Sequence, residues 1–449
     1  MSADTIYALS SAAGKAGVSV VRVSGPSALK SLSQIARLEK DPVARMALFT
    51  GLYDEDNLID RALVLPFSAP ASFTGEDVVE YHIHGSMAVL DALLKALSKM
   101  DKHRPADRGE FTRRAFENGK MDLTEAEAVA DLIDAQTQAQ REQALRQMGG
   151  SLSSLYEGWR SNLIRAMAYI EAVIDFPDED VPDSETSKVK PDLEKLIAEI
   201  TEHLNDNRRG ERLRDGIHIA IVGAPNAGKS SLLNALAKRD IAIVSPLAGT
   251  TRDIVEAHLD IAGFPVVLAD TAGLRPEEVS DDGGHGTIES EGIRRAVARA
   301  KDADLLLLLF DGTSENLDKH TLALRQDNSI VVYTKSDLAA FNQDKARKMN
   351  AVAVSSASSR GMDALLEALS DTIKTSFSVS REAPSLTRER HRAALQECLK
   401  HLQGAMKAIL PELMAEDVRM AARAIGRITG RVDVEDLLDV IFRDFCIGK

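Results

Sequence analysis

The sequence has little cysteine and no long hydrophobic run. Only two of its 449 residues are cysteines, which is too few for a disulfide framework and favours a reducing compartment. The longest apolar stretch, Leu305–Phe310, is far too short to span a bilayer. No basic start followed by an apolar segment opens the sequence, so no signal peptide is predicted. We therefore expect a cytoplasmic protein that is not held in a membrane.

An excess of positive charge is also missing. The chain carries 55 Lys and Arg against 69 Asp and Glu, for a net charge of −14. Because neutralising phosphates requires clustered basic residues, this balance excludes a general electrostatic grip on nucleic acid. Any RNA contact is expected to be local or made mainly by a partner. The apolar content of 44% is ordinary for a globular protein, and the length predicts two to four domains.

Hydrophobic periodicity divides the chain into four segments. Short apolar runs such as Val18–Val23 and Val78–Ile83 alternate with helical stretches near the N-terminus and predict an α+β domain. A strongly helical pattern follows, then alternating strands and helices typical of a doubly wound parallel sheet, then a second helical pattern. The simplest arrangement is a discontinuous helical domain with an inserted α/β nucleotide domain. The predicted segments are 1–118 (α+β), 119–210 (helical), 211–378 (α/β) and 379–449 (helical).

The most informative motif is GAPNAGKS at residues 223–230. Its G-x4-G-K-S spacing is that of a P-loop, and the strand-like run Ile217–Val222 and the helical stretch Ser231–Lys238 flank it as a P-loop requires. In such a loop backbone N–H groups surround the β-phosphate, Lys229 reaches the β- and γ-phosphates, and Ser230 offers a hydroxyl to Mg²⁺. The motif predicts nucleotide binding.

Three later elements favour guanine as the base. Asp270–Gly273 (DTAG), Thr334–Asp337 (TKSD) and Ser356–Ser358 (SAS) each follow a strand-like run, which is where doubly wound sheets bind ligands. Asp270 is placed to hold the Mg²⁺ shell, while Asp337 can accept from guanine N1–H and the 2-amino group. A backbone N–H of the SAS element can reach O6. The predicted GTP-binding residues are Asn226, Ala227, Gly228, Lys229, Ser230, Ser231, Asp270, Thr271, Ala272, Gly273, Thr334, Lys335, Asp337, Ser356, Ala357 and Ser358.

Two positions depart from the common GTPase pattern. Thr334 replaces the usual Asn and can make one of its bridging bonds but not both, so we expect GTP preference to survive with some affinity lost. Leu274 follows DTAG where Ras-like proteins have glutamine, and no arginine finger is identifiable. Asn226 is placed to coordinate a monovalent cation in place of that arginine. Either Glu289 or Glu291 can orient the attacking water.

Over its whole length the sequence resembles the bacterial tRNA-modification GTPase family MnmE, also called TrmE. The shared stretches are GAPNAGKSSLLNAL, VSPLAGTTRD, DTAGLR, FTGEDV, IDFP and the terminal FCIGK. The resemblance implies a Ras-like G domain that is activated by potassium and dimerises across its nucleotide sites. It selects Glu289 as the catalytic glutamate, with Glu291 as the fallback because the preceding segment is longer here. It also implies K⁺ ligands at Asn226, Ser245, Leu247 and Thr250, and Mg²⁺ ligands at Ser230 and Thr251; Ser245, Thr250 and Thr251 thereby join the predicted GTP site.

The resemblance further implies an N-terminal domain that binds a tetrahydrofolate derivative, either 5-formyl- or methylene-tetrahydrofolate, as a one-carbon source. Its contacts map onto Arg22, Glu80, Lys120 and Lys449. From the residues alone, Arg22 and Glu80 would be interpreted as a cross-strand ion pair. Cys446, otherwise an ordinary helix-end cysteine, becomes a candidate catalytic residue of undefined chemical role.

The implied partners are tRNA and a second protein. Family members form a homodimer that joins the FAD-dependent MnmG (GidA) in a heterotetramer, and together they add an aminomethyl or carboxymethylaminomethyl group at C5 of the wobble uridine, U34. The alternative hypothesis is a GTP-switched ribosome-assembly or RNA-binding factor of the Era/Der type. Such factors usually append a basic RNA-binding domain, which this acidic chain lacks.

Two smaller patterns leave alternatives open. His82 and His84 alternate along one strand and could bind a metal, although structural roles are favoured because no third ligand is in view. A second pattern is a stripe of arginines at i, i+4 spacing that could contact tRNA. Because acidic residues lie close by in the sequence, a salt-bridged helix face is favoured. The stripe consists of Arg419, Arg423, Arg427 and Arg431.

Overall fold

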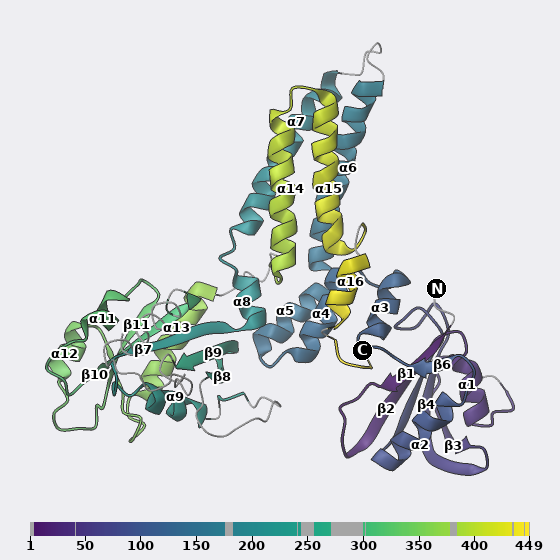
Figure 1. The fold of residues 1–449 in the computed structure, drawn as a ribbon, viewed down its shortest axis with the longest axis horizontal. Helices are drawn as coiled ribbons and strands as arrows, with labels where there is room; N and C mark the ends of the chain where they lie inside the picture. Colours follow the sequence, from purple (N-terminus) through teal and green to yellow (C-terminus); the bar gives the residue numbers. More distant parts are fainter. Residues whose placement is uncertain are drawn as a thin grey trace, which may run out of the picture. The chain divides into compact units, whose positions relative to one another are not determined.

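The computed structural model describes most of the chain in two compact units. The described residues are 4–40, 42–175, 183–239, 241–243, 256–270, 300, 302–377, 384–432, 435–443 and 445–448, without the side chains of 183–188, 270 and 435–437. The first unit consists of residues 1–130, 147–193 and 400–449, and the second of residues 131–146 and 194–399. Figure 1 labels the elements of both.

The first unit contains a six-stranded sheet in the order β3-β4-β5-β2-β1-β6. Its neighbouring strands are antiparallel except for β1 and β6, which are parallel. This mixed sheet with two covering helices is the α+β domain that the sequence predicts. The strands are β1 (Thr5–Leu9), β2 (Ala16–Ser24), β3 (Leu48–Asp54), β4 (Asn57–Phe67), β5 (Val78–Gly85) and β6 (His103–Pro105).

Helices α1 (Ala28–Ile35) and α2 (Met87–Ser98) pack on one face of this sheet. Leu32 of α1 and Leu93 of α2 share a single core with Tyr81 of β5. Side chains alternate across a strand, so the residues beside a buried one point to the opposite face. On that opposite face Phe111, from α3 (Glu110–Glu117), packs with alternate residues of β1.

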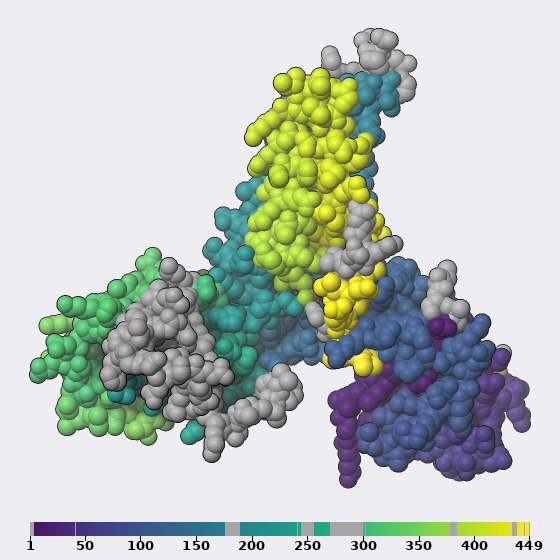
Figure 2. Space-filling model, viewed as in Figure 1, coloured from purple at the N-terminus to yellow at the C-terminus, as the bar shows by residue number. Residues whose placement is uncertain are grey.

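Long helices complete the first unit. Helix α6 (Ser151–Asp175) lies alongside α15 (Pro411–Thr429), as Figure 1 shows. Helix α14 (Glu389–Lys407) also lies beside α15, where His401 Nδ1 is 3.1 Å from Asp417 Oδ1, and in Figure 2 their side chains meet without a gap. Within the described residues, no helix is both long and apolar enough to cross a membrane. The remaining helices are α4 (Leu123–Asp134), α7 (Asp183–Leu204) and α16 (Glu435–Arg443). Residues 131–134 of α4, 194–204 of α7 and 389–399 of α14 belong to the second unit.

The second unit is built on a sheet in the order β12-β11-β10-β7-β9-β8. All neighbours are parallel except β8 and β9. The central strand β10 is buried from Leu305 to Phe310, because helices cover both faces of a parallel sheet. The strands are β7 (Ile217–Gly223), β8 (Glu256–Ile261), β9 (Phe264–Asp270), β10 (Leu305–Asp311), β11 (Ser329–Thr334) and β12 (Val352–Ala353).

Helices on both faces make this the doubly wound sheet that the sequence predicts. Helices α9 (Lys229–Ala237) and α13 (Met362–Phe377) bury leucines against one face, while α11 (Lys319–Ala323) and α12 (Gln343–Lys348) cover the other. Helices α5 (Gln138–Met148) and α8 (Arg209–Asp215) also belong to this unit except for the last residues of α5. A single residue, Gly216, separates the end of α8 from the start of β7.

Candidate functional site

The P-loop connects β7 to α9 and depends on unusual backbone angles. Gly228 precedes the helix with φ +93°, a left-handed conformation that favours glycine. Asn226 has φ +63°, which Asn tolerates better than most residues. A Cβ at Gly223 would lie 2.6 Å from the Leu309 carbonyl oxygen, so only glycine fits between β7 and β10. These residues therefore allow the tight turn that connects β7 to α9.

The P-loop lysine points back into its own loop. Lys229 Nζ donates hydrogen bonds to the carbonyl oxygens of Gly223 and Ala224, both at 2.9 Å, and the residue is 8% exposed. A buried ammonium that is hydrogen-bonded to carbonyl oxygens can exchange them for a stronger anionic partner. The N-terminus of α9 adds its own partial positive charge at the same place. The loop is therefore prepared to bind phosphate.

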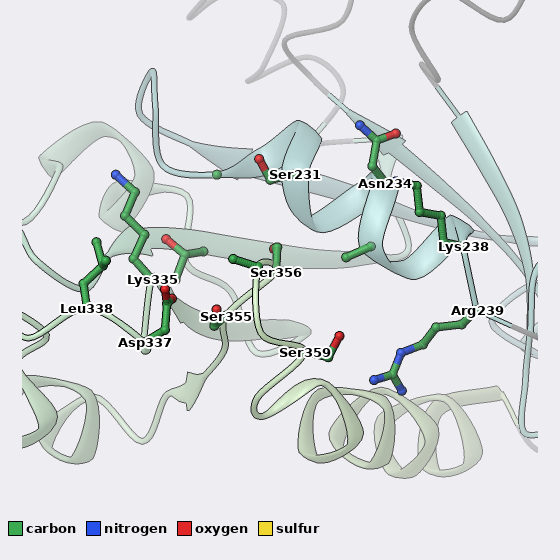
Figure 3. Close-up of a pocket in the computed structure, with 14 residues that line it drawn as sticks. Ser231, Asn234, Lys238, Arg239, Lys335, Asp337, Leu338, Ser355, Ser356 and Ser359 are labelled. Carbon is green, nitrogen blue, oxygen red and sulfur yellow. The ribbon is translucent and has the colours of Figure 1, made fainter.

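A cavity of about 570 Å³ adjoins the loop (Figure 3). It is formed by three elements that the sequence analysis selects: the P-loop with α9, the TKSD segment and the SAS segment. Figure 3 shows Asp337 and Ser355 at one end of the cavity and Lys238 and Arg239 at the other. The lining residues are Gly228, Ser231, Asn234, Ala235, Lys238, Arg239, Thr334, Lys335, Asp337, Leu338, Ser355, Ser356, Ala357 and Ser359.

Asp337 is exposed to this cavity and stays ionised. A hydrogen bond from the Ser355 hydroxyl lowers the pKa of the Asp337 carboxyl below its usual range. Ser355 is itself 1% exposed, and its Oγ accepts a hydrogen bond from the backbone N–H of Ser358 at 3.1 Å. An ionised carboxylate accepts hydrogen bonds only, which suits the N1–H and 2-amino donors of guanine. Sequence analysis misses Ser355 because its role requires the TKSD and SAS loops to meet.

Lys335 is held by a carboxylate from the neighbouring strand. Its Nζ lies 2.5 Å from Asp311 Oδ2. Partial burial opposes ionisation of Asp311, but the hydrogen bonds from Lys335 and Thr313 outweigh it and lower the pKa of the Asp311 carboxyl. Lys335 also has φ +61°, a strained backbone of the kind that is common at functional sites. Asp311 escapes sequence analysis, although it ends β10 directly beside Thr334 in the register of the sheet.

Thr334 joins the base-binding strand to the P-loop. It is 3% exposed, and its Oγ1 lies 2.7 Å from the Ala227 carbonyl oxygen and 3.3 Å from that of Phe310. The structure therefore places Thr334 on the P-loop side of the base-binding strand.

Several predicted residues lie outside the described part of the chain. Asp270 ends β9, and the register of the sheet pairs its Cα with that of Ile221 on β7, two residues before the P-loop; its side chain is not among those described. Asn226 and Ser230 are both exposed and supply the amide and hydroxyl oxygens that K⁺ and Mg²⁺ accept as ligands. The residues outside are Ser245, Leu247, Thr250, Thr251, Thr271, Ala272, Gly273, Leu274, Glu289, Glu291 and Lys449.

In the first unit the ion pair between Arg22 and Glu80 is present. The two residues face each other across β2 and β5, and Arg22 Nη2 lies 2.9 Å from Glu80 Oε1. The guanidinium also lies near two aromatic rings, 5.2 Å from the centre of Phe73 and 5.7 Å from that of Phe111. Lys120 Nζ donates to the carbonyl oxygen of Pro70 at 3.0 Å. Arg22 and Lys120 thus both contact the loop of residues 70–75.

The histidines of β5 have carboxylate neighbours. His82 Nε2 lies 3.8 Å from Glu80 Oε2, and His84 Nδ1 lies 2.9 Å from Asp60 Oδ1. No group of three or more potential metal ligands occurs among the described residues. Each histidine thus has one carboxylate neighbour in the same sheet, and its structural role stays a prediction.

The C-terminal segment packs against the N-terminal domain and carries Cys446. The backbone N–H of Gly109 donates to the Cys446 carbonyl oxygen at 3.4 Å, and the Ser10 hydroxyl donates to the Gly448 carbonyl oxygen at 2.9 Å. Phe445 is buried with Leu123 in the core beneath α16, whereas Cys446 is exposed. These contacts present the Cys446 side chain to solvent beside the N-terminal domain.

Two arginines of the predicted stripe, Arg419 and Arg431, form ion pairs, as the salt-bridged interpretation expects. Arg419 contacts Glu171 of α6 at 3.0 Å and Glu416 at 2.5 Å. Arg431, just after α15, lies 3.1 Å from Glu157 of α6. These two arginines therefore help to hold α15 against α6.

Comparisons with known proteins cover the whole chain. The family model described as GTP-binding protein TrmE N-terminus matches residues 5–120, and the MnmE helical domain model matches residues 123–446. The chain is 53% identical to the tRNA modification GTPase MnmE of Parvibaculum lavamentivorans over 99% of this chain and 100% of that protein. It is also 53% identical to the protein of the same name from Rhodospirillum rubrum over the full length of both.

One solved structure is similar to about a third of the chain. The G domain of the T. maritima FeoB iron transporter is 25% identical, covers 35% of this chain and 98% of its own, and has a TM-score of 0.25. The full-length identity and the two family models decide the assignment. The chain is a GTPase involved in tRNA modification and belongs to the MnmE family.

Proposed function

We propose that this protein is a potassium-activated GTPase that works with an FAD-dependent partner of the MnmG (GidA) type. Together they add an aminomethyl or carboxymethylaminomethyl group at C5 of the tRNA wobble uridine. The one-carbon unit comes from a tetrahydrofolate derivative. The observation that carries the cation mechanism is the exposed, left-handed Asn226 at the tip of the P-loop. The family assignment favours tRNA modification over the ribosome-assembly alternative.

In this proposal the nucleotide site hydrolyses GTP by positioning and charge neutralisation. Lys229 moves from its two loop carbonyls to the β- and γ-phosphates, and Ser230 with Thr251 holds Mg²⁺. Asn226, together with Ser245, Leu247 and Thr250, would hold K⁺, which supplies the positive charge that an arginine finger gives elsewhere. Glu289 would orient the attacking water, with Glu291 as the alternative. Transient pairing of two nucleotide domains would complete the site.

The modification chemistry would take place in the N-terminal domain. Arg22, Glu80, Lys120 and Lys449 would bind the folate, which supplies the one-carbon unit when it is bound. The residues present suit a flat, partly charged ligand, since the Arg22–Glu80 pair lies beside the Phe73 ring and Lys120 contacts the same loop. The exposed Cys446 would act on the tRNA side of the reaction. The active assembly would be a homodimer joined to its partner in a heterotetramer.

The cation mechanism is tested by GTP hydrolysis in KCl and in NaCl at equal ionic strength. The full-length chain should hydrolyse GTP several-fold faster in KCl, and N226A should reduce the ratio of the two rates to near one. N205A changes an exposed asparagine after α7 and should keep the wild-type ratio. Equal rates in the two salts for the wild-type chain would refute the proposal.

The tRNA substrate is tested by mass spectrometry of wobble uridines from a strain that lacks the gene. Loss of the C5 modification, restored by the wild-type gene but not by C446S or R22A, is the expected result. GTP hydrolysis by each variant is measured in parallel, because it separates damage to the modification site from damage to the nucleotide domain. If the deletion strain keeps the wild-type level of wobble-uridine modification and shows a ribosome-assembly defect instead, the alternative function is favoured.

A further inference from the structure

Among the described residues, the hydroxyl group of Thr334 has acceptors as its hydrogen-bond partners. The polar atoms within hydrogen-bond distance are the carbonyl oxygens of Ala227, at 2.7 Å, and Phe310, at 3.3 Å. A carbonyl oxygen cannot donate, and a threonine hydroxyl has a single proton. That proton is therefore given to a backbone carbonyl, and the shorter distance assigns it to Ala227 in the P-loop. Both Thr334 and Ala227 are buried, so water does not compete for the bond.

The methyl group of Thr334 packs on the same loop. A Cβ added at Gly228 would lie 3.5 Å from Thr334 Cγ2, so the methyl group occupies the space directly behind the loop glycine. On the strand side, the backbone N–H of Gly312 donates to the Thr334 carbonyl oxygen at 3.1 Å. Thr334 is therefore fixed between β10 and the P-loop by its hydroxyl, its methyl group and its backbone.

This arrangement determines which atoms of guanine can be recognised. The base presents N1–H and the 2-amino group as donors, and O6 and N7 as neighbouring acceptors. The Asp337 carboxylate accepts hydrogen bonds from these donors, and a backbone N–H of Ser356–Ser358 is expected to donate to O6. An asparagine at position 334 would have two N–H donors, one for the loop and one for the base. Thr334 has no second proton to give to N7.

We propose that Thr334 is a positioning residue that fastens the P-loop to the base-binding strand and gives guanine N7 no donor from its own side chain. The protein therefore accepts guanine nucleotides altered at position 7, such as 7-deazaguanine nucleotides in which N7 is a C–H group. The inference rests on the family's GTPase activity and not on the proposed cation or folate chemistry. It also explains the lower GTP affinity expected from Thr334 in place of the usual asparagine, as the loss of a hydrogen bond to guanine N7.

The test compares the affinities of GDP and 7-deaza-GDP for the full-length chain by isothermal titration calorimetry. The wild-type protein should bind the two within about twofold of each other, whereas T334N should prefer GDP by about tenfold, the size of one hydrogen bond. Because 7-deaza substitution also alters the electron distribution of the ring, the comparison between wild-type and T334N ratios isolates the contact to N7. A wild-type preference for GDP of fivefold or more would overturn the proposal without reference to any variant.

The fastening role is tested by two further variants. T334V keeps the shape but leaves the buried Ala227 carbonyl without its donor, so it should weaken both nucleotides equally, by about tenfold. T334S keeps the hydroxyl and should restore most of the affinity. A T334V variant that is folded by circular dichroism and binds both nucleotides like wild type would show that the hydroxyl does not position the loop.

Discussion

Arg212 of α8 forms an ion pair with Asp304, with 2.5 Å between Nε and Oδ1. Asp304 lies at the start of β10, where Oδ2 also accepts a hydrogen bond from the backbone N–H of His218 at 3.0 Å. The guanidinium of Arg212 lies 5.4 Å from the centre of the Phe377 ring, at the end of α13. Through these contacts α8 is attached to the first strand, the central strand and the last helix of the nucleotide domain.

Replacing Arg212 by methionine should destabilise this region by about 2 kcal/mol. The value is below that for a fully buried pair because Arg212 is partly exposed.

The effect of R212M should depend on pH. Burial raises the pKa of the Asp304 carboxyl, while the His218 N–H and the Arg212 charge oppose the rise. A raised folded-state pKa means that ionised Asp304 destabilises the fold at neutral pH, and R212M raises this pKa further. The destabilisation should therefore shrink as the pH falls through the folded-state pKa. Hydrogen exchange of the β7 and β10 amides at several pH values measures it, with exposed Arg325 as the control in R325M. A loss that does not depend on pH would show that Arg212 acts by packing alone.

Gly210 allows α8 to pack closely against the backbone of Leu386. A Cβ there would lie 2.1 Å from the Leu386 carbonyl oxygen, which is backbone and cannot move aside easily. G210A should therefore lower the thermal midpoint by several degrees, in line with an overpacking penalty of about 1–3 kcal/mol. Gly158, inside α6, has open space around the same position, so G158A should be neutral or slightly stabilising. Equal midpoints for the two variants, measured by circular dichroism, would mean that α8 shifts freely.

Ser355 should contribute to nucleotide affinity although it was not predicted from the sequence. S355A removes the hydroxyl that lowers the pKa of Asp337 and the acceptor for the Ser358 N–H. At pH 7 GDP affinity should fall by about fivefold to tenfold, the effect of one hydrogen bond, and S355T should retain most of it. Because ionised Asp337 is the form that accepts from guanine, binding should be lost on acidification at a higher pH in S355A than in wild type. Fluorescence titration with a labelled GDP between pH 4 and 7 follows both effects. Identical pH profiles for S355A and wild type would show that Ser355 does not influence the ionisation of Asp337.

Much of the fold could be predicted because local pattern and burial agree. The run Val18–Val23 lies within β2, and the apolar stretch Leu305–Phe310 forms most of the buried central strand β10. GAPNAGKS connects β7 to α9 as the motif requires. In each case the signal is local, whether alternation, a continuous apolar run or a motif, so neighbours in the sequence suffice for the prediction.

The missed residues depend on contacts between distant segments. Asp311 meets Lys335 because β10 and β11 are adjacent and in register, and no local pattern reveals strand order. Likewise, no local pattern shows that α5 packs with the nucleotide domain, where the Ala139 N–H donates to the Gly263 carbonyl oxygen. The Arg22–Glu80 ion pair could be predicted because opposite charges in two strand-like runs suggest it. Its folate role stays a prediction.

The two cysteines should differ sharply in reactivity. Burial, aided by the Glu397 charge, raises the pKa of the Cys398 thiol to about 12, whereas Cys446 is exposed after α16. The thiolate is the reactive form, so a disulfide reagent at pH 8 should modify one thiol rapidly in the native protein and both in denaturant. C446S should abolish the rapid phase, while C398A should leave it intact. A second rapid thiol in the native wild-type protein would mean that α14 opens often enough to expose Cys398. In that case accessibility would no longer single out Cys446 as the cysteine that can meet a substrate.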